Sequence, residues 1–214
     1  MVNANDESIL DGALRAIALS GWSRGTLAGI AADAGLSLAD LLRLYPTRAA
    51  LLEAWGRSVD FAMLAEGTAT DPGESARDRL FELLMRRFDA LAPHKETLRA
   101  LLPSFGGDPA LALTAGLGLG RSAALTLEAA GLSAAGLRGL LRVKGLSAVY
   151  LYTLRVWLAD DTADMARTMA ALDKALDQAE ALATTVFRRG GAEATAAGRV
   201  DSTSGAGGDA AANI

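Results

Sequence analysis

The stretch that decides the fold is residues 35–55, "GLSLADLLRLYPTRAALLEAW". Ser37 can cap a short helix over "LADLLRLY", because its hydroxyl can accept a hydrogen bond from a free N–H of the first turn. Pro46 must end that helix, since proline has no N–H and restricts the residue before it. Thr47 can then cap a second helix that begins "RAALLEAW". The stretch therefore predicts two helices joined by a very short turn.

The residues before this stretch repeat the same kind of pattern. Apolar side chains recur at helical spacing from Ile9 to Ile17, with Asp6 as a possible N-cap and Gly21 as the stop. Thr26 can cap a second helix, "LAGIAADA", which ends at Gly35. Three short helices with tight glycine turns, followed by a longer one, are therefore predicted for the N-terminal part of the chain.

The remainder of the sequence is also helical in pattern. Strong apolar spacing marks 75–91 and 145–158, and a last long helix is expected over about 162–188. From residue 190 the chain is rich in Gly, Ala, Ser, Thr and Asp and has almost no large apolar side chain, which predicts a disordered tail. We therefore expect an all-α protein with a head over 1–55, a larger helical domain over 56–189 and a tail over 190–214.

Composition narrows the possible functions. Hydrophobic residues make up 51% of the 214 residues, and cysteine is absent, which excludes disulfides and cysteine nucleophiles. The one histidine, His94, follows a proline and is expected in a solvated loop, and the sequence has no dense carboxylate cluster. We expect no metal site, no cofactor and no enzymatic activity, because no nucleophile–base pair is evident. The absence of a long apolar run and of a basic leader makes a membrane span unexpected and the cytoplasm the expected location.

Residues 9–52, "ILDGALRAIALSGWSRGTLAGIAADAGLSLADLLRLYPTRAALL", resemble the DNA-binding head of the TetR family of bacterial regulators. The shared features are the apolar positions of the first helix, Gly21 followed by Trp22, the pairs "IA" and "AG", and the "YPTR" hinge before "ALL". This resemblance implies a helix-turn-helix head on a larger helical domain that binds a ligand and dimerises. It also implies a ligand-responsive transcriptional regulator, a repressor, which binds palindromic operator DNA as a homodimer.

The resemblance implies specific DNA contacts as well. Arg48 matches the family's basic phosphate contact, and Thr26 and Ser37 can donate from helix N-termini, where the helix dipole favours an anion. Arg43 lies within the helix that should enter the groove. The net charge of −4, and the six acids against four bases in residues 1–55, argue weakly against a nucleic-acid partner.

Four residues of the recognition helix depart from the family pattern: Leu38, Asp40, Leu42 and Leu44. A carboxylate is repelled by phosphates, and leucine offers no hydrogen bond to a base edge. Helical spacing predicts that Leu41 and Tyr45 pack inside the head and that Leu38 and Leu42 are exposed on another face. The exposed pair is equally consistent with a partner contact and with an incidental surface.

A second interpretation comes from residues 140–176, "LLRVKGLSAVYLYTLRVWLADDTADMARTMAALDKAL". This segment is distantly similar to the lipid-binding accessory protein of ubiquinone biosynthesis, which has a TetR-like fold without being known as a gene regulator. The similarity implies a lipid- or isoprenoid-binding protein that no longer binds DNA. Such a protein should have a large apolar cavity.

The larger domain is expected to hold a small apolar ligand. The residues expected to line its pocket are Met85, Phe105, Arg121, Ser147, Tyr150, Thr153 and Trp157. A homodimer through the last two long helices is implied by the resemblance, and an apolar stripe on the last helix agrees with it: Met165, Met169, Leu172, Leu176, Ala179 and Leu182.

Overall fold

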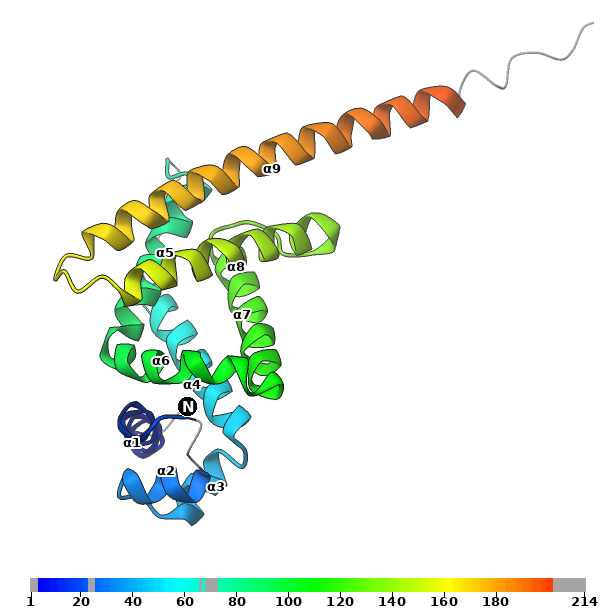
Figure 1. Ribbon diagram of the computed structural model, residues 1–214. Helices are drawn as coiled ribbons and strands as arrows, with labels where there is room; N and C mark the ends of the chain where they lie inside the picture. The colour runs from blue at the N-terminus through cyan, green and yellow to red at the C-terminus, as the bar shows by residue number, and fades with distance from the viewer. Residues whose placement is uncertain (1–3, 23–25, 66, 68–72, 202–214) are drawn as a thin grey trace, which may run out of the picture. The chain divides into compact units, whose positions relative to one another are not determined.

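The computed structural model describes residues 4–22, 26–65, 67 and 73–201 (Figure 1). Every regular element in these ranges is a helix, which confirms the all-α prediction. Residues 1–176 and 177–214 form two separate units, and each is described by itself.

The first three helices have the predicted order and nearly the predicted bounds: α1 Ala4–Ser20, α2 Leu27–Asp33 and α3 Leu38–Leu44. Gly21 and Gly35 have φ of +78° and +66°, a left-handed conformation that lets each glycine end a helix with little strain. Thr26 caps α2 as predicted, with its hydroxyl accepting from the Gly29 N–H at 3.1 Å. Ser37 stands at the N-cap of α3 without a side-chain cap bond. Asp6 lies in the first turn of α1 rather than at its cap.

The helices that follow surround the core of the larger domain (Figure 1). Helix α4 packs along α5 and α7, α7 packs against α8, and α1 packs against α6. Because α4 runs without a break from Arg48 to Leu64, it physically connects the head to this domain, and the boundary expected at residue 55 stays a prediction. The remaining bounds are α5 Ala76–Leu91, η1 Ala92–His94, α6 Lys95–Leu101, η2 Leu102–Gly106, α7 Pro109–Ala129 and α8 Gly136–Leu158.

Helix α7 is the one described helix that is long and apolar enough to cross a membrane by length and composition. It forms a wall of the larger domain, where Leu111, Ala123 and Leu127 are buried against neighbouring helices. Its sequence contains Gly116, Gly118 and Gly120, so its intrinsic helix propensity is low and packing must hold it.

Asp160 organises the corner between α8 and the last helix, α9 (Ala166–Asp201). One carboxylate oxygen accepts from the N–H and the hydroxyl of Thr168, at 2.9 and 2.8 Å, and the other accepts from the Thr162 hydroxyl at 2.6 Å. The carboxylate thereby satisfies a free N–H in the first turn of α9. These hydrogen bonds, with that of the Thr162 hydroxyl first, hold the pKa of Asp160 well below its usual range.

The last helix departs from the prediction. Helix α9 runs from Ala166 to Asp201 and so extends beyond the predicted end near residue 188, while 202–214 lie outside the described residues and the disordered tail stays a prediction. The alanines of "GGAEATAAGRV" have high helix propensity and continue the helix without large apolar side chains. Within residues 1–176, Leu172 and Leu176 are buried, so this part of the apolar stripe faces the core of its own chain.

Candidate functional site

The helix pair α2 and α3 presents one face of α3 outward because the opposite face is anchored. Leu41 is fully buried and Tyr45 nearly so, as helical spacing predicted. The Tyr45 hydroxyl lies 3.4 Å from the Asp6 carbonyl oxygen and donates to it, which connects the end of α3 to α1. The arrangement is a helix-turn-helix whose second helix is accessible on its outer side.

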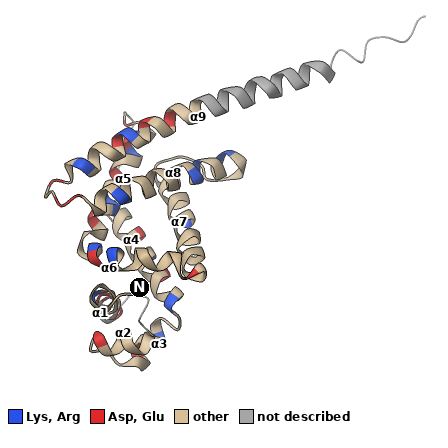
Figure 2. Cartoon of the chain, viewed as in Figure 1, with Lys and Arg blue, Asp and Glu red and all other residues tan. Residues whose placement is uncertain are grey.

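The outer face of α3 is mostly apolar. Leu38 and Leu42 are each 39% exposed, which confirms the prediction that both lie on the surface. Asp40 and Arg43 are also exposed, and the Arg43 guanidinium lies 3.6 Å from the Asp40 carboxylate. Figure 2 shows how few basic residues α2 and α3 carry. The one cation of this helix is therefore partly neutralised by its own neighbour.

Arg48, at the start of α4, has a role that the sequence did not reveal. Its guanidinium donates to the Trp22 carbonyl oxygen at 2.7 Å, and its central carbon lies 4.2 Å from the centre of the Trp22 ring. Trp22 is buried immediately after the turn that ends α1. Arg48 thus fastens the beginning of α4 to the α1–α2 connection, and its predicted contact with a phosphate stays a prediction.

The described arginine of α1 is also paired with a carboxylate. Arg15 pairs with Asp11 at 2.6 Å on the surface of α1. Arg24 lies outside the described residues. Thr26 and Ser37 are both exposed at the N-termini of α2 and α3. The exposed polar groups of the described head therefore include the N-termini of α2 and α3 and the Arg43 side chain.

His94 is not the solvated loop residue that its position after Pro93 suggested. It ends η1, its side chain is largely covered, and its ring meets the edge of Trp55 at 5.9 Å between centres. Its Nε2 lies 3.7 Å from an Asp11 oxygen. Burial lowers the pKa of His94. The residue contributes to the packing between α1 and the larger domain.

Of the seven residues predicted to line a pocket, the structure places Tyr150 at a cavity. Arg121, predicted to face inward, is 64% exposed and pairs with Glu53 at 3.6 Å. Thr153 and Trp157 are buried in the core, and the Thr153 and Ser147 hydroxyls donate to carbonyls of their own helix. Met85 and Phe105 are half-buried. Arg121 was misplaced because α7 carries small residues on every side, so its sequence does not define which face is inside, and the pocket role of the other six residues stays a prediction.

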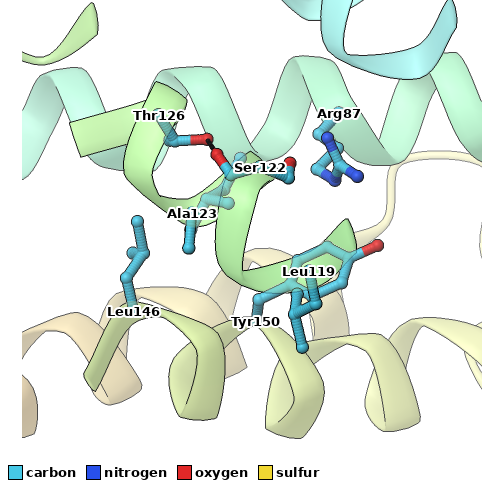
Figure 3. Close-up of a pocket in the computed structure, with 8 residues that line it drawn as sticks. Arg87, Leu119, Ser122, Ala123, Thr126, Leu146 and Tyr150 are labelled. Atoms are coloured by element: carbon cyan, nitrogen blue, oxygen red, sulfur yellow. Dashed lines mark hydrogen bonds between the residues drawn. The ribbon is translucent and has the colours of Figure 1, made fainter. Parts of the chain in front are cut away.

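The cavity lies between α5, α7 and α8 (Figure 3). Its volume is about 10 Å³, roughly the room that one water molecule needs. Four of its lining residues carry polar groups and four are apolar. The lining residues are Leu84, Arg87, Leu119, Ser122, Ala123, Thr126, Leu146 and Tyr150.

Arg87 is the functional candidate that sequence reasoning missed. It lies on the buried face of α5, between Leu84 and Leu91 at helical spacing, and it forms an ion pair with Asp60 of α4. The Ser122 hydroxyl donates to the same Asp60 oxygen at 2.6 Å. A charged residue at a position that the helical pattern assigns to the core was the signal that could have revealed it.

Comparisons with known proteins agree with this geometry. A TetR transcriptional regulator from Nitrosomonas europaea is 24% identical, with a TM-score of 0.67 over 83% of this chain and 99% of that one. Two further TetR regulators, both from Rhodococcus, are 20% and 18% identical, with TM-scores of 0.59 and 0.57 over 81% of this chain. No family model and no curated protein matches the sequence. The chain therefore has a TetR-like fold, as the N-terminal residues predicted.

Proposed function

We propose that the protein is a cytoplasmic, ligand-responsive transcriptional regulator that binds palindromic operator DNA as a dimer and acts as a repressor. The observation that carries the proposal is the helix-turn-helix, in which buried Leu41 and Tyr45 leave the opposite face of α3 accessible. Solved structures with the same fold are described as transcriptional regulators, which supports the assignment.

DNA contact would rely more on phosphates than on bases. Thr26 and Ser37 stand at helix N-termini, where free N–H groups and the helix dipole favour a phosphate. Arg43 supplies the exposed cation of α3, and Arg48 both fixes Trp22 and lies at the start of α4. The exposed leucines of α3 suit apolar contact with thymine methyl groups, which is a weak form of base recognition.

Dimerisation is proposed through the last two long helices, α8 and α9. Helix α8 contributes an exposed apolar surface, in which Leu137 is 74% exposed and Leu151 and Tyr152 are 52% exposed. An exposed apolar surface of this kind on a helix is typical of a protein contact. A twofold dimer would place two heads side by side, as a palindromic operator requires.

A ligand would act by shifting an equilibrium between two arrangements of the heads. The ligand is proposed to bind in the larger domain, where the cavity between α5, α7 and α8 has room for no more than a water-sized group, so the ligand-contacting residues stay a prediction. The lipid- or isoprenoid-binding alternative is not favoured, since it requires a large apolar cavity and this one has about 10 Å³.

The test is selection of duplexes by the purified protein from a pool of genomic fragments, followed by affinity measurements at 50 and 200 mM salt. Sequence-selective binding that weakens with salt is expected. Arg43→Ala should weaken binding, whereas Arg121→Ala should not. Arg121 is a matched control because both side chains are 64% exposed and both pair with a carboxylate at 3.6 Å. Absence of selective binding at low salt, with or without a cell lipid extract, would contradict the proposal.

A further inference from the structure

The outer face of α3 offers few hydrogen-bonding groups to the edges of DNA bases. Between Leu38 and Leu44 the helix carries no amide and no hydroxyl side chain, and its two polar residues are Asp40 and Arg43. These two side chains pair with each other at 3.6 Å. The contacts by which asparagine and glutamine recognise adenine through two hydrogen bonds are therefore absent from this helix.

Apolar side chains make up the rest of this face. Leu38 and Leu42 lie one helical turn apart and are each 39% exposed, and Ala39 is exposed beside them. Exposed leucine is unfavourable in water, and its burial against another apolar group is favourable. Thymine presents an apolar group in the major groove, the methyl group at C5, which cytosine lacks. The chemistry of this face therefore matches a methyl group better than a hydrogen-bonding base edge.

The spacing of the two exposed leucines determines which base pairs they can reach. Four residues of an α-helix rise about 6 Å, at roughly 1.5 Å per residue. Successive base pairs lie about 3.4 Å apart along the duplex. When α3 lies along the major groove, Leu38 and Leu42 therefore reach base pairs about two steps apart.

We propose that α3 recognises its operator through the C5 methyl groups of two pyrimidines about two base pairs apart, one against Leu38 and the other against Leu42. This inference rests on the proposed function, since it names the base chemistry that the recognition helix binds. Thymine carries this methyl group, and 5-methylcytosine carries the same group at the same ring position. The protein should therefore accept 5-methylcytosine where it rejects cytosine, so its binding to such sites should respond to cytosine methylation.

The test uses the duplex of highest affinity from the genomic selection, in which each thymine of a half-site is replaced in turn by uracil, which lacks only the methyl group. Fluorescence anisotropy should show a response at two positions, about two base pairs apart, with the affinity falling roughly fourfold at each because one buried methyl group is lost. Replacement of either T·A pair by C·G should also lower the affinity. At the same position, 5-methylcytosine should restore most of that loss.

Two variants assign each leucine to its base. Leu38→Ala and Leu42→Ala should each bind the unmodified duplex more weakly, and each should lose the uracil response at one of the two positions, because that methyl group no longer has its partner. Leu113→Ala is the matched control, since Leu113 is a 64% exposed leucine on α7, and this variant should keep both responses. The uracil series on the original protein needs no variant, so it decides if a substitution in α3 disturbs folding.

Selective binding that is unchanged by uracil at every thymine would overturn the inference and leave the proposed function intact. Equal affinity for cytosine and 5-methylcytosine at the responsive positions would overturn it as well. Uracil responses that persist in both Leu38→Ala and Leu42→Ala would show that other residues contact the methyl groups, which also contradicts the inference. Absence of any selected duplex would overturn the proposed function and this inference together.

Discussion

Asp40 should oppose DNA binding, and Asp40→Asn should strengthen it. Its carboxylate lies 3.6 Å from the Arg43 guanidinium, and the two side chains are 54% and 64% exposed. At this separation in a water-like dielectric, two unit charges interact by about 1 kcal/mol. Once the carboxylate is neutral, Arg43 no longer interacts with it and can pair with a DNA phosphate instead. The affinity for DNA should therefore rise roughly fivefold at low salt. Loss of the repulsion between Asp40 and phosphates acts in the same direction.

The assay is a fluorescence-anisotropy titration of a duplex selected by the protein, at several salt concentrations. Release of Arg43 should steepen the slope of log affinity against log salt by up to about one, since one more phosphate is neutralised. Asp11→Asn is the matched control because it neutralises an exposed carboxylate paired with Arg15, on α1 rather than α3. It changes the net charge of the head equally.

Two results would refute this reasoning. An equal gain in DNA affinity from Asp40→Asn and Asp11→Asn would mean that the net charge of the head acts at a distance. It would give no reason to place α3 against the DNA. No strengthening by Asp40→Asn, with selective binding intact, would mean that Arg43 and Asp40 lie away from the DNA. In the second case, the N-termini of α2 and α3 would remain as the proposed phosphate contacts.

Three further predictions concern the stability of the fold. Arg48→Ala should lower stability by about 2 kcal/mol, because a hydrogen bond and a ring contact to Trp22 are lost, and thermal unfolding measures this apart from DNA affinity. Gly139→Ala should lower Tm by roughly 4–8 °C, because a Cβ would lie 2.1 Å from backbone atoms, whereas Gly145→Ala, with open space around it, should raise Tm by about 2–4 °C. The lowered pKa of Asp160 stabilises the fold above about pH 4 and is lost on acidification, so Asp160→Asn should flatten the fall of Tm below that pH.

The head was predictable because its signals are local. Glycine at two left-handed positions, a threonine cap and helical spacing fixed the bounds of α2 and α3 and the burial of Leu41 and Tyr45. The clamp of Arg48 on Trp22 could not be foreseen, since it joins residues 26 positions apart whose distance depends on the packed angle between helices. Spacing along one helix carries no information about that angle.

The cavity was less predictable for a related reason. Helix α7 is rich in small residues on every side, so its sequence does not show which face is inside, and Arg121 was assigned to the wrong face. Helix α5 has a clear apolar face, and there the charged Arg87 between Leu84 and Leu91 was visible in the sequence. Arg87, the buried charge, therefore lies on the helix with the clearest apolar face, at the one position where that apolar pattern is interrupted.

Asp60, the partner of Arg87, lies on the same helix as Arg48, which contacts Trp22 of the head. Asp60 and Arg48 lie on one unbroken helix, about 18 Å apart at 1.5 Å per residue. A helix with no proline and no break in its hydrogen bonds moves as a unit over this length. Arg48 fastens one end of the helix to the head, and Asp60 fastens the other part to α5 and α7. The two ends of this helix are therefore held separately, one by the head and the other by the larger domain.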